Sequence, residues 1–281
     1  MSTTFNYDTF VTRNEGYIRK ETQAKIRETR LLCAGAGLGG QLILAAARLG
    51  VRRFTLVDGD TVEAHNLNRQ AFYFEDIGQP KAEALKRHIL RINPEAEVEA
   101  VVANLDQHNA AQLVGQADII FDTIDFLDLD AILQLHSQAQ RQARPIFTAL
   151  SAGDGACVMY IPADAKASLA DIIAHDVGAA RSEQEASYAN VFGKIMARIG
   201  AHLDRQVVEQ VARALTVMED GRPCPASQLV TGALATAALA VTMMHDLLDG
   251  RAVPQAPLLV AHSYRSGGTR LVDISTDQPA H

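Results

Sequence analysis

Hydrophobic and polar positions alternate between two kinds of segment along residues 31 to 150. Short apolar runs predict buried strands, and each is followed by apolar positions at helical spacing. The predicted strands cover residues 31–35, 53–58, 97–102, 118–121 and 145–150. The predicted helices cover residues 38–49, 80–91, 107–114 and 127–142. This alternation predicts an α/β fold: a Rossmann-like, mostly parallel sheet with helices on both faces.

The pattern changes after residue 150. Residues 155–161 predict a strand that runs antiparallel to the others, and residues 162–225 carry helical patches without a strand pattern. We expect this second segment to be a helical, partly mobile insertion. An alanine-rich segment, residues 226–248, predicts a buried core helix rather than a membrane span, because polar residues interrupt it. Two short strands at 258–262 and 269–274 complete the pattern.

These segments predict a single domain built from four consecutive parts. The parts are an N-terminal arm (1–30), a core (31–161), an insertion or crossover region (162–225) and a C-terminal helix with strands (226–281). A length of 281 residues with 48% hydrophobic and 21% charged content fits one large globular unit.

Charge and cysteine usage narrow the class of protein. A formal net charge of −7 argues against a nucleic-acid-binding surface, which is usually basic. The N-terminus lacks the pattern of a signal peptide, and three widely spaced cysteines predict neither a disulfide framework nor a zinc site. We therefore expect a cytoplasmic protein without a nucleic-acid or membrane partner.

A glycine-rich loop lies between the first predicted strand and helix and predicts a nucleotide site. Gly35 permits a tight turn, Gly37 allows the backbone to approach a phosphate, and Gly40 allows close packing of helix on strand. Asp58 ends the second strand, where a carboxylate binds the ribose hydroxyls of an adenosine. Asp60 follows it and is either a second ligand or a turn residue.

Further polar residues favour a triphosphate over a dinucleotide. Asn66, Arg69 and Lys81 follow the second strand, and a hydride-transfer enzyme has little use for these cations. An arginine and a lysine that converge on phosphates would neutralise the charge of a departing pyrophosphate. Asp125 follows the fourth strand and is suited to holding magnesium against those phosphates.

With these motifs in place, the chain resembles the ThiF/MoeB/HesA type of adenylyltransferases, which are related to ubiquitin-activating enzymes. The matching segments are Arg13-Asn14, Gly35-Ala36-Gly37-Leu38-Gly39-Gly40, Val57-Asp58-Gly59-Asp60-Thr61-Val62, Asn66-Leu67-Asn68-Arg69-Gln70, Gly78-Gln79-Pro80-Lys81, Ile92-Asn93-Pro94 and Asp122-Thr123-Ile124-Asp125. Their order and spacing fit the family from the N-terminus to about residue 160.

The resemblance implies an enzyme that binds MgATP and activates a carboxylate as an acyl-adenylate, with release of pyrophosphate. It implies that Asp58 holds the ribose, that Asn66, Arg69 and Lys81 contact phosphates, and that Asp125 orients magnesium. It also implies a homodimer in which Arg13 reaches the partner's ATP. The implied substrates are the C-terminus of a ubiquitin-like protein, a peptide or a small molecule.

The sequence departs from the family pattern in three places. Leu38 and Gly39 are exchanged relative to the usual loop, and Phe126 replaces the asparagine that usually follows the aspartate. The two Cys-x-x-Cys pairs of many members are absent, so we do not expect zinc. Cys224 is the one candidate for a nucleophile near the end of the insertion. A packing role is the alternative for Cys224, and we expect adenylation without a thioester stage.

Two alternative functions remain. An NAD-dependent oxidoreductase would use the glycines and Asp58 but would leave Asn66, Arg69 and Lys81 without a role. A catalytically inactive scaffold of a heteromeric activating enzyme would keep the fold for partner binding. Retention of the phosphate-binding side chains argues against the scaffold.

Overall fold

The computed structural model describes residues 4–125, 128–166, 169, 199–200, 202–219 and 227–275. Its centre is one eight-stranded sheet with the strand order β3-β2-β1-β4-β5-β6-β7-β8. The strands are β1 Arg30–Ala34, β2 Arg53–Val57, β3 Glu97–Val101, β4 Ile119–Asp122, β5 Ile146–Ala152, β6 Gly155–Ile161, β7 Leu258–Ser263 and β8 Gly268–Asp273. The first five strands pair in parallel and the last three pair antiparallel, which confirms the predicted fold class.

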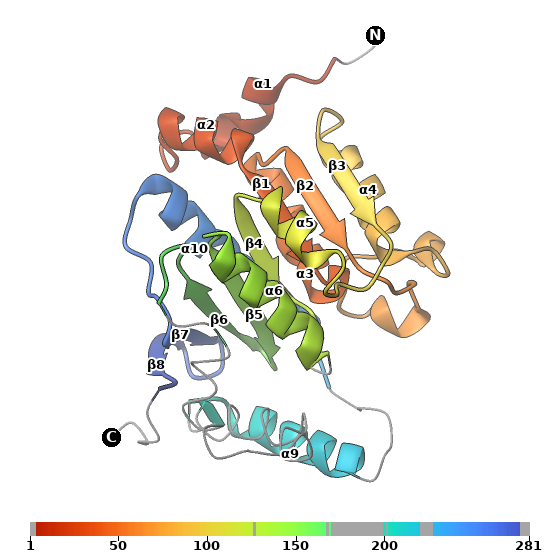
Figure 1. Cartoon of the computed structure of the whole chain (residues 1–281), viewed down its shortest axis with the longest axis vertical. Coiled ribbons are helices and arrows are strands. Elements are labelled where there is room, and N and C mark those ends of the chain that lie inside the picture. The colour runs from red at the N-terminus through yellow and green to blue at the C-terminus, as the bar shows by residue number, and fades with distance from the viewer. Residues whose placement is uncertain are drawn as a thin grey trace.

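Helices cover both faces of the sheet (Figure 1). They are α1 Tyr7–Val11, α2 Lys20–Glu28, α3 Ala36–Leu49, α4 Lys81–Ile92, α5 Ala110–Gly115, α6 Leu129–Arg141, α9 Arg205–Glu219 and α10 Val230–Asp249. Three short 3-10 turns, η1 Thr12–Asn14, η2 Ala64–Asn66 and η3 Phe74–Asp76, interrupt the loops. Helices α3, α4 and α10 contribute to one hydrophobic cluster, and α5 and α6 contribute to the other.

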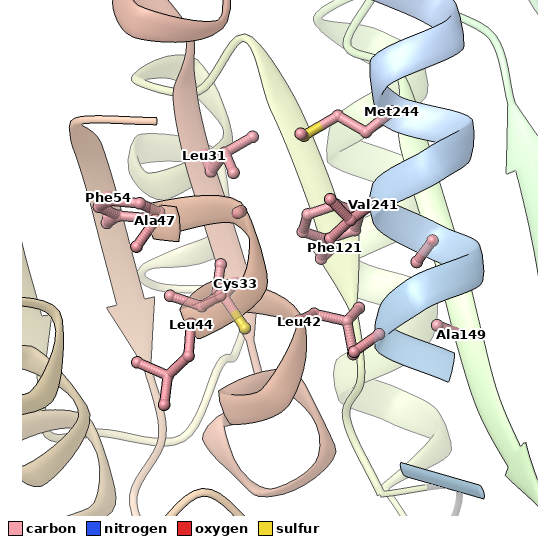
Figure 2. Packing of buried hydrophobic residues seen from close by; sticks show 14 of the residues in the cluster. Leu31, Cys33, Leu42, Leu44, Ala47, Phe54, Phe121, Ala149, Val241 and Met244 are labelled. Atoms are coloured by element: carbon pink, nitrogen blue, oxygen red, sulfur yellow. The ribbon is translucent and has the colours of Figure 1, made fainter. Parts of the chain in front are cut away.

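The two clusters follow from the strand period of two. In β1, Leu31 and Cys33 belong to the first cluster, whereas Leu32 and Ala34 belong to the second. All four side chains are buried, because a parallel strand in the middle of such a sheet is covered on both faces. Figure 2 shows the first cluster, where side chains of β1 and β4 meet those of α3 and α10.

Helix α10 is long and apolar enough, by length and composition alone, to cross a membrane. In the structure it packs against α3, α2 and the sheet strands β5 and β6. Its buried residues include Ala240 and Met244, and a Cβ on its Gly232 would clash with the backbone of Gly153. The prediction of a core helix is therefore confirmed.

The strand order reverses between β1 and β4. From β1 the chain continues outward through β2 to β3, and from β4 it continues in the opposite direction to β5. In open α/β sheets, ligands bind at this switch point, beyond the carboxyl ends of the strands. The residues that follow β1, β2 and β4 therefore define the region in which a site is expected.

Candidate active site

The glycine loop follows β1 and begins α3. Gly35 has a φ of +90°, and a Cβ there would clash with the carbonyl oxygen of Thr123, so only glycine fits. A Cβ on Gly39 would clash with the Cys33 thiol and the Thr123 hydroxyl. We expected Gly40 to allow the close packing of helix on strand, but in the structure Gly39 is the glycine that lets α3 approach β1. Gly40 lies against Ala71 of the following loop, where an added Cβ would be 3.2 Å from the Ala71 Cβ.

Asp58 ties the end of β2 to the start of α3. Its Oδ2 accepts a hydrogen bond from Ala36 N at 2.7 Å, and its Oδ1 accepts one from Asp60 N at 2.8 Å. Burial raises the pKa of Asp58 above its ordinary value, and the nearby charge of Lys81 acts in the opposite direction. The carboxylate is thus fixed beside the glycine loop, in the position predicted for a ribose ligand.

Lys81 is the first residue of α4 and pairs with Asp60. The ammonium Nζ lies 2.7 Å from Asp60 Oδ2, and Lys81 N donates to Asp60 O at 2.9 Å. Only 10% of the lysine side chain is exposed, against 70% of the aspartate side chain. The lysine is therefore held by its surroundings, while its carboxylate partner faces solvent.

Arg69 lies in the loop after η2 and has three oxygen partners. Its Nε donates to Gln228 Oε1 at 2.5 Å, and Nη1 donates to His65 O at 2.8 Å and to Asn68 Oδ1 at 3.1 Å. Burial lowers the pKa of Arg69, and the charge of Asp125 raises it. The loops that follow β2 and β4 therefore bring this guanidinium and this carboxylate within electrostatic range of each other.

Asn66 is 4% exposed and stabilises its own turn. Its Oδ1 accepts from Glu63 N at 2.9 Å in a capping box, and its Nδ2 lies 3.2 Å from His65 Nε2. The amide therefore supports the segment that carries Arg69, and its contact with a phosphate stays a prediction.

Gln70 was part of the matched motif but had no assigned role. A Cβ on Gly37 would lie 3.0 Å from its Nε2, so the amide lies against the glycine loop. Its Oε1 is buried and has no hydrogen-bond partner among the described residues. Buried polar atoms are nearly always satisfied, so a water or a ligand is expected to donate a hydrogen bond to this oxygen.

Arg13 is not brought to this region within one chain. It lies in η1, next to Asn14, whose Nδ2 donates to Leu49 O at 2.9 Å at the far end of α3. A helix rises 1.5 Å per residue, so α3 places Arg13 about 20 Å from the glycine loop. The arm lies at the amino ends of the strands (Figure 1), and an in-trans role for Arg13 stays a prediction.

The two described cysteines lie inside the core. Burial raises the pKa of Cys33 to about 12 and that of Cys157 to about 12, so both thiols stay protonated and inert. Cys224 and Phe126, two further residues that the sequence singled out, lie outside the described residues.

The model of the ThiF family matches residues 11–267, which is most of the chain. The chain belongs to the ThiF family. Solved structures agree with the fold. The match to the PaaA structure covers 95% of this chain and 79% of the PaaA chain, with a TM-score of 0.67 at 21% identity. The match to the Escherichia coli MccB structure with ATP has a TM-score of 0.65 at 18% identity. It covers 90% of this chain and 66% of the MccB chain.

Curated relatives match a little over a third of the chain. The SAMP-activating enzyme E1 of Haloferax volcanii is 36% identical over 107 residues, 37% of this chain and 40% of the relative. The molybdopterin-synthase adenylyltransferase of Escherichia coli is 36% identical over 105 residues, 37% of this chain and 42% of the relative. The matches thus span about two fifths of the length of these relatives.

Proposed function

We propose that this protein is an ATP-dependent adenylyltransferase that activates a carboxylate. One observation supports this proposal above the others: Arg69, which follows β2, and Asp125, which follows β4, come from the two sides of the switch point and lie close enough for the charge of Asp125 to oppose the effect of burial, which lowers the pKa of Arg69. Lys81 of α4 adds a second cation, which pairs with Asp60 and acts on Asp58, the carboxylate that binds the start of the glycine-loop helix. A cation pair and a carboxylate in this position suit a triphosphate, whereas hydride transfer would leave them without a role.

The chain's residues would act by positioning and by charge stabilisation. An oxygen of the substrate carboxylate forms a bond to the α-phosphorus of ATP, and the bond from that phosphorus to the bridging oxygen breaks. Pyrophosphate leaves with the bonding electrons, and the acyl-adenylate remains. Arg69 and Lys81 stabilise the charge that accumulates on the leaving group, and Asp58 fixes the adenosine end. Lys81 would exchange its exposed partner Asp60 for a phosphate.

Asp125 would hold magnesium in this proposal. Its side chain is exposed at the carboxyl end of β4, and its charge already acts on Arg69. Among the described residues, no three His, Cys, Asp or Glu side chains lie close enough to hold a metal ion by themselves. A magnesium ion here would take most of its ligands from phosphate oxygens and water, as it usually does at nucleotide sites. It would supply charge neutralisation for the phosphates.

The substrate carboxylate is proposed to be the C-terminus of a ubiquitin-like protein or a peptide, with a small-molecule acid as the third class. The names of two relatives, a SAMP-activating enzyme and a sulfur carrier protein adenylyltransferase, support the first class. Solved MccB structures that contain MccA support the second. We further propose a cytoplasmic homodimer in which Arg13 serves the partner's site, since Arg13 lies at the far end of α3 from its own.

ATP–pyrophosphate exchange with a panel of candidate acids tests the proposal. We expect exchange with at least one acid, and we expect Arg69→Ala to lower the exchange rate at least about a hundredfold. Arg91→Ala, an exposed arginine on α4, is the matched control. Tight ATP binding without exchange for any acid would favour the inactive scaffold. An acid-independent absorbance change with NAD would favour the oxidoreductase.

A further inference from the structure

Three polar side chains meet in the core directly beneath the turn that carries Asp125. His136 of α6 places its Nε2 2.8 Å from Asp122 Oδ2 at the end of β4. Thr148 of β5 donates its hydroxyl to the same Asp122 Oδ2 at 3.1 Å and lies 3.0 Å from His136 Nε2. Both members of the Asp122–His136 pair are 2% exposed at the side chain, so solvent does not screen the pair.

The second oxygen of Asp122 connects this network to the turn. Asp122 Oδ1 accepts from Ile124 N at 3.3 Å, one residue before Asp125. Two donors therefore fix Oδ2 from below, and the turn binds to Oδ1 from above. If Oδ2 loses a donor, the carboxylate can rotate about its side-chain torsions, and the turn loses a fixed acceptor.

The other side of the turn is attached to the glycine loop. Thr123 N donates to Ala34 O at 2.9 Å, and the Thr123 hydroxyl donates to Gly35 O at 2.7 Å. The backbone of residues 122–124 is thus held between the glycine loop and the buried network. This arrangement leaves the direction of the Asp125 carboxylate dependent on both supports.

We propose that Asp122, His136 and Thr148 are positioning residues for adenylation, and that they act by fixing the turn that directs Asp125 toward the magnesium-bound phosphates. This inference rests on the role of Asp125 in the proposed function. Asp122 and His136 are buried and Thr148 is half-buried, and the network meets the turn through the hydrogen bond from Ile124 N to Asp122 Oδ1. Their effect therefore passes through the backbone of the turn.

A purely structural role for the network is the alternative, and it has a different signature. A loss of core stability alone would lower the melting temperature and would affect binding of ATP equally with and without magnesium. Mispositioning of Asp125 would weaken binding only when the metal is present. The affinity for ATP in magnesium, compared with that in EDTA, therefore separates the two roles without a rate measurement.

The test uses Thr148→Val, His136→Gln and Asp122→Asn, with Asp118→Asn as the matched control. Asp118 adjoins the amino end of the same strand and ties it to Arg30, whose Nη2 donates to Asp118 Oδ1 at 2.9 Å. Calorimetric titration with ATP in magnesium and in EDTA is the readout, with circular dichroism to confirm folding. Thr148→Val, which removes one hydroxyl at nearly constant volume, keeps the test informative if Asp122→Asn does not fold.

We expect each network variant to lower the affinity for MgATP about tenfold while the affinity in EDTA stays within twofold, and we expect the control to change neither. Asp125→Asn should reproduce the same pattern. Equal loss in magnesium and EDTA, or no loss, in a folded Thr148→Val variant would overturn the positioning role. If Asp125→Asn itself leaves the magnesium dependence unchanged, the assigned role of Asp125 fails instead.

Discussion

The ammonium of Lys81 lies 2.7 Å from the carboxylate of Asp60, and the two partners differ sharply in exposure, with 10% of the lysine side chain and 70% of the aspartate side chain accessible. An exposed carboxylate is easily solvated in place of its partner, whereas the lysine has no comparable alternative in a nearly buried position. The pair therefore holds the cation in place and can release it to a phosphate.

Replacement of Lys81 tests this view of the pair. Lys81→Met keeps the aliphatic chain but removes the charge, and we expect ATP–pyrophosphate exchange to fall about a hundredfold because leaving-group stabilisation is lost. Lys86→Met, on the same helix, is the control and should leave exchange unchanged. A Lys81→Met rate within threefold of the wild type would contradict the assigned role.

Alanine substitutions at two glycines separate backbone strain from steric conflict. Gly35 and Gly78 have φ values of +90° and +82°, respectively. An added Cβ at Gly35 would clash with the backbone of Thr123, whereas an added Cβ at Gly78 would have no atom within 4 Å. We expect Gly78→Ala to lower the free energy of unfolding by about 1 kcal/mol through strain alone. Gly35→Ala adds overpacking and should cost about 3 kcal/mol or more. Urea denaturation measures both, and equal costs would show that the predicted clash is absent.

The carboxylate of Asp249 makes stability depend on pH at the junction of α2 and α10. Hydrogen bonds from Thr22 and from Arg19 lower the pKa of Asp249 to about 2, below the ordinary value of about 3.9. The stabilisation is therefore full above about pH 4 and is lost as the pH falls toward 2. We expect the difference in unfolding free energy between wild type and Asp249→Asn to be constant from pH 7 to 5 and to shrink by pH 3. An undiminished difference at pH 3 would contradict the shift.

Mixing two inactive variants tests the in-trans role of Arg13. If Arg13 serves the partner's site, Arg13→Ala and Arg69→Ala homodimers are both inactive, but a mixed dimer has one intact site. After equimolar subunit exchange, half of the dimers are mixed, so about a quarter of wild-type exchange activity should return. No recovery, with mixed dimers confirmed by native mass spectrometry, would show that Arg13 acts within its own chain or not at all.

The regular part of the fold could be predicted because periodicity is a local property. The strand at Gly155–Ile161 matches its prediction at both ends, whereas α5 begins at Ala110 rather than at residue 107. The reason is side-chain chemistry: Asp106 Oδ1 accepts from His108 N at 2.8 Å and from Asn109 N at 3.2 Å, which forms a turn before the helix can start.

Features that depend on distant pairs were not predicted. Helix α1 lies in a polar arm, and its Tyr7 is buried because Tyr7 Oη donates to Gly50 O at 2.8 Å, 43 residues away. Gln228 meets Arg69 across 159 residues, and no local pattern marks that contact. The role of Gly39 was also missed, because which glycine faces the strand depends on how α3 is oriented on the sheet. The aspartates and cations of the predicted site could be singled out from the sequence because they follow strands.

Met159 of β6 pairs with Leu259 of β7, one hundred residues further along the chain. The chain thus leaves the antiparallel half of the sheet after β6 and returns to it at β7, after α10 has packed against α3. Doubling or halving such a closed excursion changes the closure entropy by only about 0.6 kcal/mol. Changes in the length of the segment between β6 and α10 should therefore cost the sheet little stability, as long as Gln228, the partner of Arg69, is kept.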